Sequence, residues 1–302
     1  MYTTDNYNRA FWNTLRGAAF DEASMNEGRD NSGGFALPGK TADKFAEALC
    51  KDNFFRRLAT TVHISTDTSN VMAVTAEATA DWVGEGVAFP ESDDDLGLLP
   101  FTVKKLAGLT KLKKDFISDN AFDLEGYIVS GFARRFGRAE EDAFLNGNGV
   151  DAPWGILGDT NGAEVGVTTA GSAVTFDEVN ALFFSLKPEY RSDAVWVMND
   201  ETLLNLRSLK DSSGNYLWRG EPDKLNGRPV VVSDHMPSIA SGAKAVAFGA
   251  FRYYWIAENV PLSVKVLREL YAMSGMVGIA AHELLDGRLI RPEAVKVLKV
   301  HE

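Results

Sequence analysis

Cysteine, long apolar runs and basic residues are all scarce in this chain of 302 residues. The single cysteine, Cys50, cannot form an internal disulfide and lies in a helix-like run, where a buried, unreactive thiol is expected. No stretch approaches the roughly 18 consecutive apolar residues of a membrane span, and the polar N-terminus lacks the apolar core of a secretory signal. We therefore expect a soluble, intracellular protein whose fold is held by non-covalent contacts.

Basic residues are also too few to balance the acidic ones. The 31 lysines and arginines against 42 aspartates and glutamates give a formal net charge of −11. A chain without a basic surplus cannot neutralise many phosphates, which excludes tight, charge-driven binding of nucleic acid. With 45% hydrophobic and 24% charged residues, the composition is that of a packed globular protein of one or two domains.

Metal-binding and catalytic patterns are equally sparse. The four histidines are scattered, and no two of them are four residues apart: His63, His235, His282 and His301. His282-Glu283 begins a two-histidine zinc pattern, but Asp286 stands where the second histidine is needed. There is no Gly-x-Ser-x-Gly elbow and no evident histidine partner for Cys50. We predict no catalytic residue, no metal site and no cofactor.

One segment matches a nucleotide-binding pattern. Residues 34–41, GFALPGKT, fit the phosphate loop Gly-x-x-x-x-Gly-Lys-[Ser/Thr]. Such a loop must leave a buried strand, and the polar residues 27–33 cannot form one. Gly147-x-Gly149-x-x-Ala152 resembles a dinucleotide motif but follows a helix, so it is better interpreted as a helix stop. A nucleotide-binding enzyme remains a remote alternative.

An acidic segment stands out in the first half of the chain. Residues 58–103 contain eight acids and no lysine or arginine. Alternating apolar residues predict strands near Val62 and Val71 and a return strand from Val103 to Leu112, hence a long two-stranded excursion around an acidic tip. A lone hairpin is at best marginally stable, so its own domain or a neighbouring subunit should support it. A solvated loop is the alternative.

Helical patterns lie on either side of this segment. Tyr7, Phe11 and Leu15 at four-residue spacing predict a short helix in a polar N-terminal arm. Thr41 is expected to cap a second helix that ends near Thr60. The strongest signal covers residues 118–146, where apolar residues recur at every fourth position from 124 to 136. At about 1.5 Å per residue, this helix would be roughly 40 Å long.

Beyond residue 160, short helices and strands alternate. Thr175 and Glu178 form a capping-box pattern, and Asn199 is placed to cap a later helix. Strands are expected near residues 194–198, 229–232, 245–248, 252–256 and in the tail 262–300. These patterns predict an α/β or α+β domain of about 100 residues.

A series of short segments follows a recognisable order along the chain. They are Gly33-Gly34-Phe35-Ala36-Leu37-Pro38, then residues 80–86 (ADWVGEG), 141–157, 196–199 (WVMN), 211–218, 225–230 (LNGRPV), 234–237, 248–251 (FGAF), 276–281 and 291–294 (RPEA). In this order they resemble the tailed-bacteriophage major capsid proteins with the Hong Kong 97 fold. The Gly-Gly junction of that family also offers another explanation for the phosphate-loop match.

The resemblance implies an α+β capsid fold in four parts. These are an N-terminal arm (1–40), an extended β-hairpin loop (60–110), a peripheral domain with a spine helix near 118–146 (41–59, 111–154 and 261–290), and an axial domain (155–260 and 291–302). It implies hexamers and pentamers that close into an icosahedral shell around double-stranded DNA. The protein would be assembled in the host cytoplasm, reside in the virion and contact portal, scaffold or decoration proteins, but no membrane.

The chain departs from the family in two respects. Cross-linking members use a lysine in the extended loop, an asparagine before the tail-strand methionine and a glutamate seven residues later. Residues 58–103 contain no lysine, and Gly275 and His282 occupy the other two positions, although Glu283 is adjacent. We therefore expect no isopeptide cross-links. Only 32 residues precede Gly33, so we expect a separate scaffold or unaided assembly rather than an attached scaffolding domain.

The predicted interface residues come from these motifs and from the charge pattern. The acidic loop should contact a basic neighbour, for which the spine-helix arginines are the candidates. An encapsulin, a cellular compartment of the same fold, is the nearest alternative to a phage shell. The interface candidates are Tyr7, Phe11, Gly33, Gly34, Pro38, Trp82, Glu85, Asp93, Asp94, Asp95, Arg134, Arg135 and Arg138.

Overall fold

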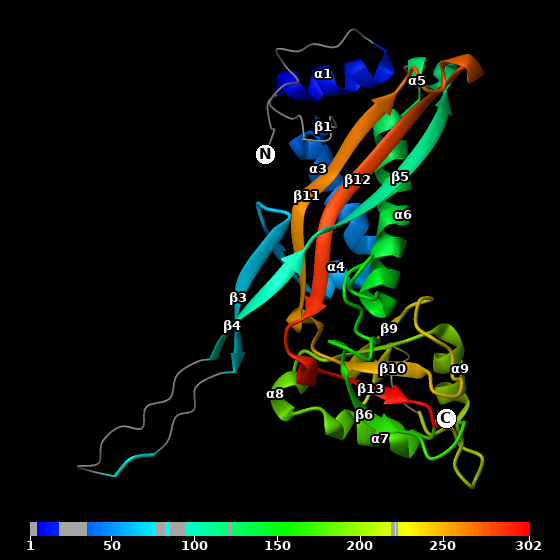
Figure 1. The fold of residues 1–302 in the computed structure, drawn as a ribbon. Helices are drawn as coiled ribbons and strands as arrows, with labels where there is room; N and C mark the ends of the chain where they lie inside the picture. Colours follow the sequence, from blue (N-terminus) through cyan, green and yellow to red (C-terminus); the bar gives the residue numbers. More distant parts are fainter. Residues whose placement is uncertain are drawn as a thin grey trace.

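The computed structural model describes residues 5–17, 35–76, 82–84, 95–119, 122–218, 221 and 223–302. Its architecture is mixed α+β, as predicted: a long sheet with helices on one side, a second sheet at its lower end, and a hairpin that leaves the body (Figure 1). Some interface candidates lie outside the described residues, namely Gly33, Gly34, Glu85, Asp93 and Asp94, and for Asp95 only the backbone is described.

The first sheet consists of β1 (Phe35–Ala36), β2 (Thr60–His63), β5 (Lys104–Lys113), β11 (Tyr254–Leu267) and β12 (Met276–Leu289). β11 and β12 pair antiparallel from Tyr254 opposite Leu289 to Leu267 opposite Gly278. β5 pairs antiparallel with the far side of β12 and is the last described strand there, while β1 and β2 pair with β11. The sheet is therefore long and narrow.

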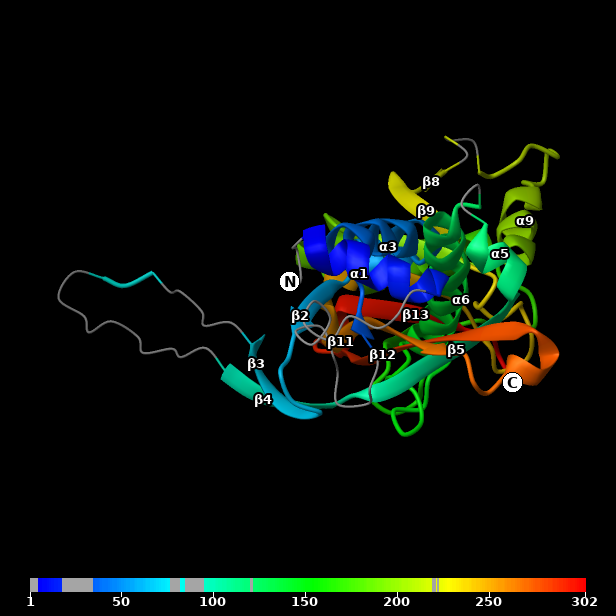
Figure 2. The same cartoon turned by 90° about the horizontal axis from the view of Figure 1, so that it is seen from above.

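Helices cover one face of this sheet, as the view from above shows (Figure 2). They are α1 (Asp5–Arg16), α3 (Gly39–Asp52) and α6 (Leu124–Asn146). The predicted apolar stripe of the spine helix is confirmed, because Leu124, Ile128, Phe132 and Phe136 are all buried in one core with residues of α1 and α3. α6 is thus the spine against which the sheet packs.

The spine helix is shorter than predicted at its N-terminus. Residues 114–118 form a separate short helix, α5 (Lys114–Ser118), and α6 begins only at Leu124. Asp123 explains the boundary, because its carboxylate accepts a hydrogen bond from the Gly126 amide at 2.9 Å and so caps α6. The expected start at residue 118 was wrong because the apolar spacing alone does not locate a cap.

The helix expected from Thr41 to about Thr60 is two helices. α3 begins at Gly39, after Pro38, and ends at Asp52. Asn53 then adopts an extended conformation (φ −130°) and its side chain accepts a hydrogen bond from the Phe55 amide at 2.9 Å. Asn53 thereby ends one helix and caps the next, α4 (Phe54–Leu58).

The acidic segment forms a two-stranded hairpin, as its alternating pattern predicted. Its strands are β3 (Thr68–Ala76) and β4 (Asp95–Thr102), which pair antiparallel and lead away from the body (Figures 1 and 2). The return strand expected at 103–112 is instead β5, in the first sheet. One face of β5 packs against the spine helix, since Gly108 lies directly against Phe136 of α6.

The second sheet has the order β6-β13-β10-β7-β9-β8. Its strands are β6 (Glu164–Thr168), β7 (Val195–Met198), β8 (Lys224–Leu225), β9 (Arg228–Val232), β10 (Lys244–Gly249) and β13 (Val295–Lys299). The helices beside it are α7 (Phe176–Ser185), α8 (Pro188–Arg191) and α9 (Asp200–Ser208). Both predicted caps are confirmed: Thr175 and Glu178 form the capping box of α7, and Asn199 accepts from the Thr202 amide at 2.7 Å.

An aromatic core joins the two sheets. Phe55 of α4 is fully buried, with its ring centre 5.4 Å from that of Phe144 on α6 and 5.0 Å from that of Tyr254 on β11. The same core includes Val195 and Val197 of β7, in the second sheet. The end of the spine helix is therefore the place where both sheets meet.

Replacement of Phe55 by alanine should destabilise the unassembled subunit by about 3–5 kcal/mol, because it removes a fully buried ring from this junction. The measurement is urea unfolding. Phe184→Ala is the matched control, since Phe184 is 67% exposed and its removal should change stability by less than about 0.5 kcal/mol. Equal effects of the two substitutions would contradict the assigned role.

Candidate functional site

Trp82 is the interface candidate that the structure leaves most accessible. Residues 82–84, the described part of the chain between β3 and β4, lie away from the body, and the Trp82 side chain is fully exposed (106%). Met72 of β3 and Leu98 of β4 face each other across the hairpin and are each 61% exposed. Large exposed apolar side chains of this kind mark a protein–protein contact.

The N-terminal candidates lie inside the subunit. Tyr7 and Phe11 of α1 are only 2% and 3% exposed, and the Tyr7 hydroxyl donates a hydrogen bond to the Ala36 carbonyl at 2.6 Å. Pro38 is buried at the start of α3. In the subunit these residues therefore pack on their own chain, because the apolar face of α1 is turned inward.

The three arginines of α6 do not form one patch. Arg135 turns toward β5, where it donates hydrogen bonds to the Leu109 carbonyl and the Thr110 hydroxyl. Arg134 lines the hollow between α6 and β5 together with Arg135. Arg138 lines a different hollow, whose other basic residues are Lys51, Arg57 and His235. The exposed positive charge of the spine helix thus points to two surfaces.

The phosphate-loop alternative loses its structural basis. Phe35 and Ala36, inside the motif, form a strand paired with β11. Thr41, whose hydroxyl would be needed at a nucleotide-bound metal, is buried and donates instead to Glu125 at 3.1 Å. The segment is a packed junction between a strand and α3.

A buried ionic cluster lies where α4, α6 and the first sheet meet. Its members, here called the junction cluster, are Arg56, Glu140, Glu258 and Glu283. Arg56 makes a two-pronged ion pair with Glu140, one arm of which measures 2.9 Å, and its third nitrogen lies 3.3 Å from Glu258. Asn53 also donates to Glu140 at 3.0 Å. The Arg56 guanidinium therefore pairs with the carboxylates of Glu140 and Glu258, and it also interacts electrostatically with Glu283.

Glu283 is the least compensated member of the cluster. It is 1% exposed, and its Oε1 atom is buried without a hydrogen-bond partner among the described residues. Burial, and then the charge of Glu140, raises the pKa of Glu283 well above its usual range, against the opposing effect of Arg56. The protonated form of Glu283 is thereby favoured, which leaves two negative charges opposite Arg56.

The sequence interpretation missed this cluster, although a signal was present. Glu140 continues the four-residue spacing of Phe132 and Phe136 toward Phe144, so an acid occupies a position of the buried stripe. A charge at such a position indicates a buried partner. The partner itself could not be named, because Arg56 is 84 residues away in the chain.

The next residue of α6 ties the helix to the second sheet. The Ser233 hydroxyl, just after β9, donates to Glu141 at 2.6 Å, and the Phe54 amide donates to the other oxygen at 3.4 Å. Burial raises the pKa of Glu141, while these hydrogen bonds act in the opposite direction. Glu140 and Glu141 thus hold α4, the first sheet and the second sheet at one end of the spine.

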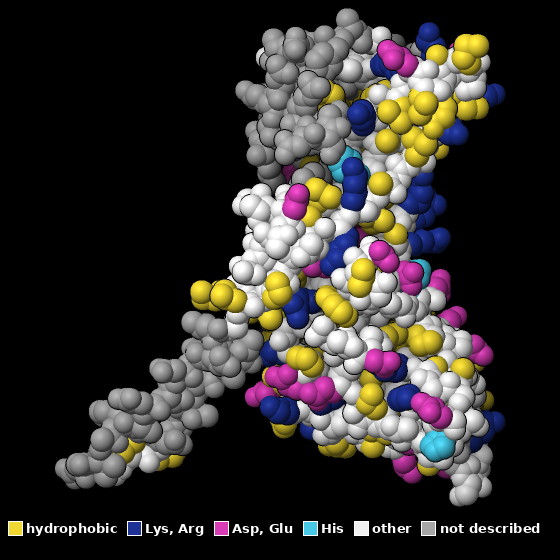
Figure 3. All heavy atoms as spheres, in the orientation of Figure 1, with side chains coloured by type: hydrophobic (Ala, Val, Ile, Leu, Met, Phe, Trp, Pro, Cys, Tyr) yellow, Lys and Arg dark blue, Asp and Glu magenta, His cyan; other side chains and the backbone are white. Residues whose placement is uncertain are grey.

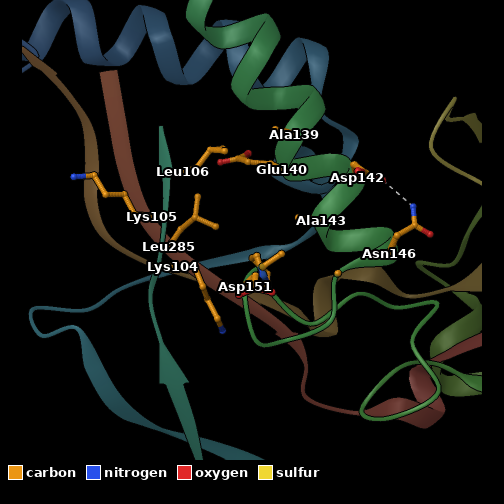
Figure 4. Close-up of a pocket in the computed structure, with 13 residues that line it drawn as sticks. Lys104, Lys105, Leu106, Ala139, Glu140, Asp142, Ala143, Asn146, Asp151 and Leu285 are labelled. Atoms are coloured by element: carbon orange, nitrogen blue, oxygen red, sulfur yellow. Dashed lines mark hydrogen bonds between the residues drawn. The ribbon is translucent and has the colours of Figure 1, made fainter. Parts of the chain in front are cut away.

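A cavity of about 260 Å³ opens between β5 and the C-terminal half of α6. Leu106 of β5 and Leu285 of β12 face Glu140 across it, and Ala139 and Ala143 of α6 form the opposite wall (Figure 4). Lys104 and Lys105 point away from its centre. Its volume lies near the lower end of the roughly 300–1,000 Å³ of small-molecule sites, and one large side chain would fit into it.

Exposed apolar and basic side chains also gather on the uncovered side of the first sheet (Figure 3). At its upper end the exposed apolar residues are Leu109, Phe116, Leu270 and Met273. The described part of the chain contains no group of three or more metal-binding side chains and no helix long and apolar enough to cross a membrane. The exposed apolar and basic side chains on this side of the sheet are suited to contacts with another protein.

Replacement of Glu283 by glutamine should remove a pH-dependent loss in the free energy of unfolding. Both folded and unfolded Glu283 hold the proton well below pH 4.5, but above it the unfolded chain releases the proton while the raised pKa keeps it on the folded one. The wild type should therefore lose stability relative to Glu283→Gln as pH rises from about 4 to 8. Urea unfolding across this range checks it, with Glu47→Gln, at a 72% exposed position, as control. A constant difference between the two proteins would contradict the assignment.

Comparisons with known proteins agree with this architecture. The model of the phage capsid family matches residues 33–300. The capsid of a native GTA particle is 30% identical with a TM-score of 0.69, covering 82% of this chain and 90% of that chain. The capsid of an empty GTA particle is 31% identical with a TM-score of 0.71, covering 82% and 89%. A structure from Microbacterium phage Oxtober96 is 17% identical with a TM-score of 0.60, covering 82% and 91%, and so shares the fold. No curated protein gives a match.

The family match and the two GTA capsids agree with the resemblance seen in the sequence. They do not favour the encapsulin alternative or a nucleotide-binding enzyme. The two sheets, the spine helix and the projecting hairpin of this chain are those of a capsid subunit with the Hong Kong 97 fold. The chain belongs to the phage capsid family.

Proposed function

We propose that this chain is the major capsid protein of a tailed phage or prophage, and that its copies assemble as hexamers and pentamers into an icosahedral shell around double-stranded DNA. The β3–β4 hairpin carries the proposal, because it leaves the body and the described residues 82–84 beyond it include a fully exposed Trp82. A two-stranded hairpin is marginally stable by itself, so a neighbouring copy completes it. The two GTA capsids at 30% and 31% identity support a phage-type shell over an encapsulin.

The two sheets support a division of the subunit into domains. We assign residues 1–40 to the N-terminal arm and 60–110 to the extended loop. The first sheet and α6 belong to a peripheral domain of residues 41–59, 111–154 and 261–290. The second sheet belongs to an axial domain of residues 155–260 and 291–302. In this assignment the junction cluster joins the peripheral domain to the axial one.

The shell is held without covalent cross-links. Residues 58–103 contain no lysine, and Gly275 and His282 replace the other two residues that cross-linking relatives use. The adjacent Glu283 offers no substitute, because its side chain is 1% exposed and faces Arg56 and Glu140 inside its own subunit. Non-covalent contacts between copies therefore supply the stability of the particle.

Electron microscopy of the purified full-length protein should show closed shells, and size-exclusion chromatography should give megadalton assemblies. Boiled particles should run on a denaturing gel as a single 33.0 kDa band, because no cross-linking set is present. Nuclease-protected double-stranded DNA in particles from phage-producing cells would support genome packaging. A ladder of covalent multimers would contradict the absence of cross-links, and enclosed cargo protein without DNA would favour an encapsulin-like compartment.

The remaining partners follow from the same proposal. Portal, scaffold or decoration proteins of the same phage would contact the shell, and assembly would take place in the host cytoplasm before the protein becomes part of the virion. The net charge of −11 argues for enclosure of DNA rather than tight binding, because few phosphates can be neutralised. No catalytic step is assigned to the chain.

The acidic loop requires a basic surface on the neighbouring copy. Residues 77–95 contain seven acids and no lysine or arginine. Arg134, Arg135 and Arg138 of α6 are the proposed partners, with Glu85, Asp93, Asp94 and Asp95 among the acids that they would contact. Attraction of this kind steers and orients association more than it tightens it.

Charge reversal of Arg134 and Arg138 to glutamate should impair assembly and leave subunit folding intact, because both side chains are exposed. Arg135 is left unchanged, since it also bonds to β5 within the subunit. The measurements are light scattering for assembly and urea unfolding for the subunit. Lys187→Glu, at a 63% exposed position beside the second sheet, is the control. Normal particles from the double variant would refute the proposed pairing.

A further inference from the structure

Trp82 is the most exposed aromatic side chain among the described residues. Its side chain is 106% exposed, and residues 82–84 lie apart from the rest of the described chain (Figures 1 and 2). Tryptophan is enriched among the few residues that dominate the energy of protein interfaces, where its large ring fills a pocket of the partner. If Trp82 anchors a contact, the partner must offer a hollow large enough for an indole ring.

The cavity between β5 and α6 has a volume and a lining that suit one indole ring. Its volume of about 260 Å³ is several times the roughly 30 Å³ of a water molecule, and it opens to solvent. Leu106, Leu285 and Pro153 give apolar walls from three different segments of the chain. Asp142 and Asp151 at its edge carry carboxylates that can accept the indole N–H.

Two other hollows, one near Arg138 and one at Leu204, fit an indole less well. The hollow near Arg138 is lined by Lys51, Asp52, Arg57 and further charged residues, so a buried ring would leave charges without water. The hollow at Leu204 is lined by residues of a single helix, α9. The β5–α6 cavity alone among these hollows combines apolar side chains from β5, β12 and α6.

Charge complementarity points to the same place. Asp81 and Glu85 flank Trp82 in the sequence. On the surface, Arg135 of α6 is exposed and lies one helical turn before Ala139 of the cavity wall. An acid beside Trp82 can thus pair with Arg135 at the α6 side of the cavity.

We propose that Trp82 of one copy inserts into the β5–α6 cavity of a neighbouring copy and anchors the extended hairpin there. This inference rests on the proposed shell function and names the contact that holds adjacent subunits. β5 is the last described strand on its side of the first sheet, so the arriving chain meets no further strand at this edge. In this arrangement the acids beside Trp82 approach Arg135 of the neighbouring copy.

A double-mutant cycle tests the contact in the full-length protein. Trp82→Ala removes the indole ring that inserts, and Ala139→Leu fills the cavity that receives it on the neighbouring copy. Each should raise the protein concentration at half-assembly at least tenfold, and the double variant should be no worse than either single one, because both remove the same contact. Urea unfolding of the subunit should be unchanged, since both positions are exposed. Phe184→Ala, at a 67% exposed position on α7 away from the proposed contact, is the control and should assemble normally.

Disulfide formation tests directly whether Trp82 lies in the β5–α6 cavity of a neighbouring copy. In a Cys50→Ser background, Trp82→Cys combined with Ala139→Cys should give disulfide-linked multimers when assembled particles are oxidised. Trp82→Cys combined with Ala107→Cys, on the opposite face of β5, should give none. Wild-type protein that forms no particles would refute the shell function itself. Particles that form while Ala139→Leu assembles normally, or that cross-link only through position 107, would overturn this placement of Trp82 and leave the shell function standing.

Discussion

The C-terminal half of α6 is the structural element on which both sheets depend. Glu140 holds α4 through Arg56, Glu141 accepts from Ser233 beside the second sheet, and Phe144 packs on Phe55 and Tyr254. All of these contacts fall within about one and a half turns of one helix. A rigid rod fixed at one end in this way sets the angle between the two sheets.

We infer that the ionic part of this junction selects one packing arrangement more than it adds to the free energy of unfolding. Burying one guanidinium with three carboxyl groups carries a desolvation penalty that their attraction repays only if the geometry is good, and the proton favoured on Glu283 reduces the repulsion. An apolar junction could pack in several ways, whereas the two-pronged Arg56–Glu140 pair accepts one arrangement. For a subunit that must repeat the same angles around a closed shell, a single arrangement matters more than a few kilocalories of stability.

Local features of the chain were predictable because they depend on residues close in sequence. The stripe of α6, the capping box at Thr175 and Glu178, and the Asn199 cap are each set within one or two helical turns. Predictions failed where a single polar side chain divided a pattern: Asp123 shortened the spine helix, and Asn53 split the helix after Thr41. The function was predictable through the order of family motifs, not through any one site.

The sequence by itself determined the α+β class, the two-stranded acidic hairpin and the absence of a cross-linking set, since each follows from local spacing or from residue identity. Only the tertiary structure decided that Tyr7 and Phe11 face inward, that the α6 arginines separate onto two surfaces, and that a cavity lies beside β5. The physical reason is distance along the chain. Arg56 and Glu258 are 202 residues apart, and their burial depends on how the two sheets close around α6, which short-range patterns do not encode.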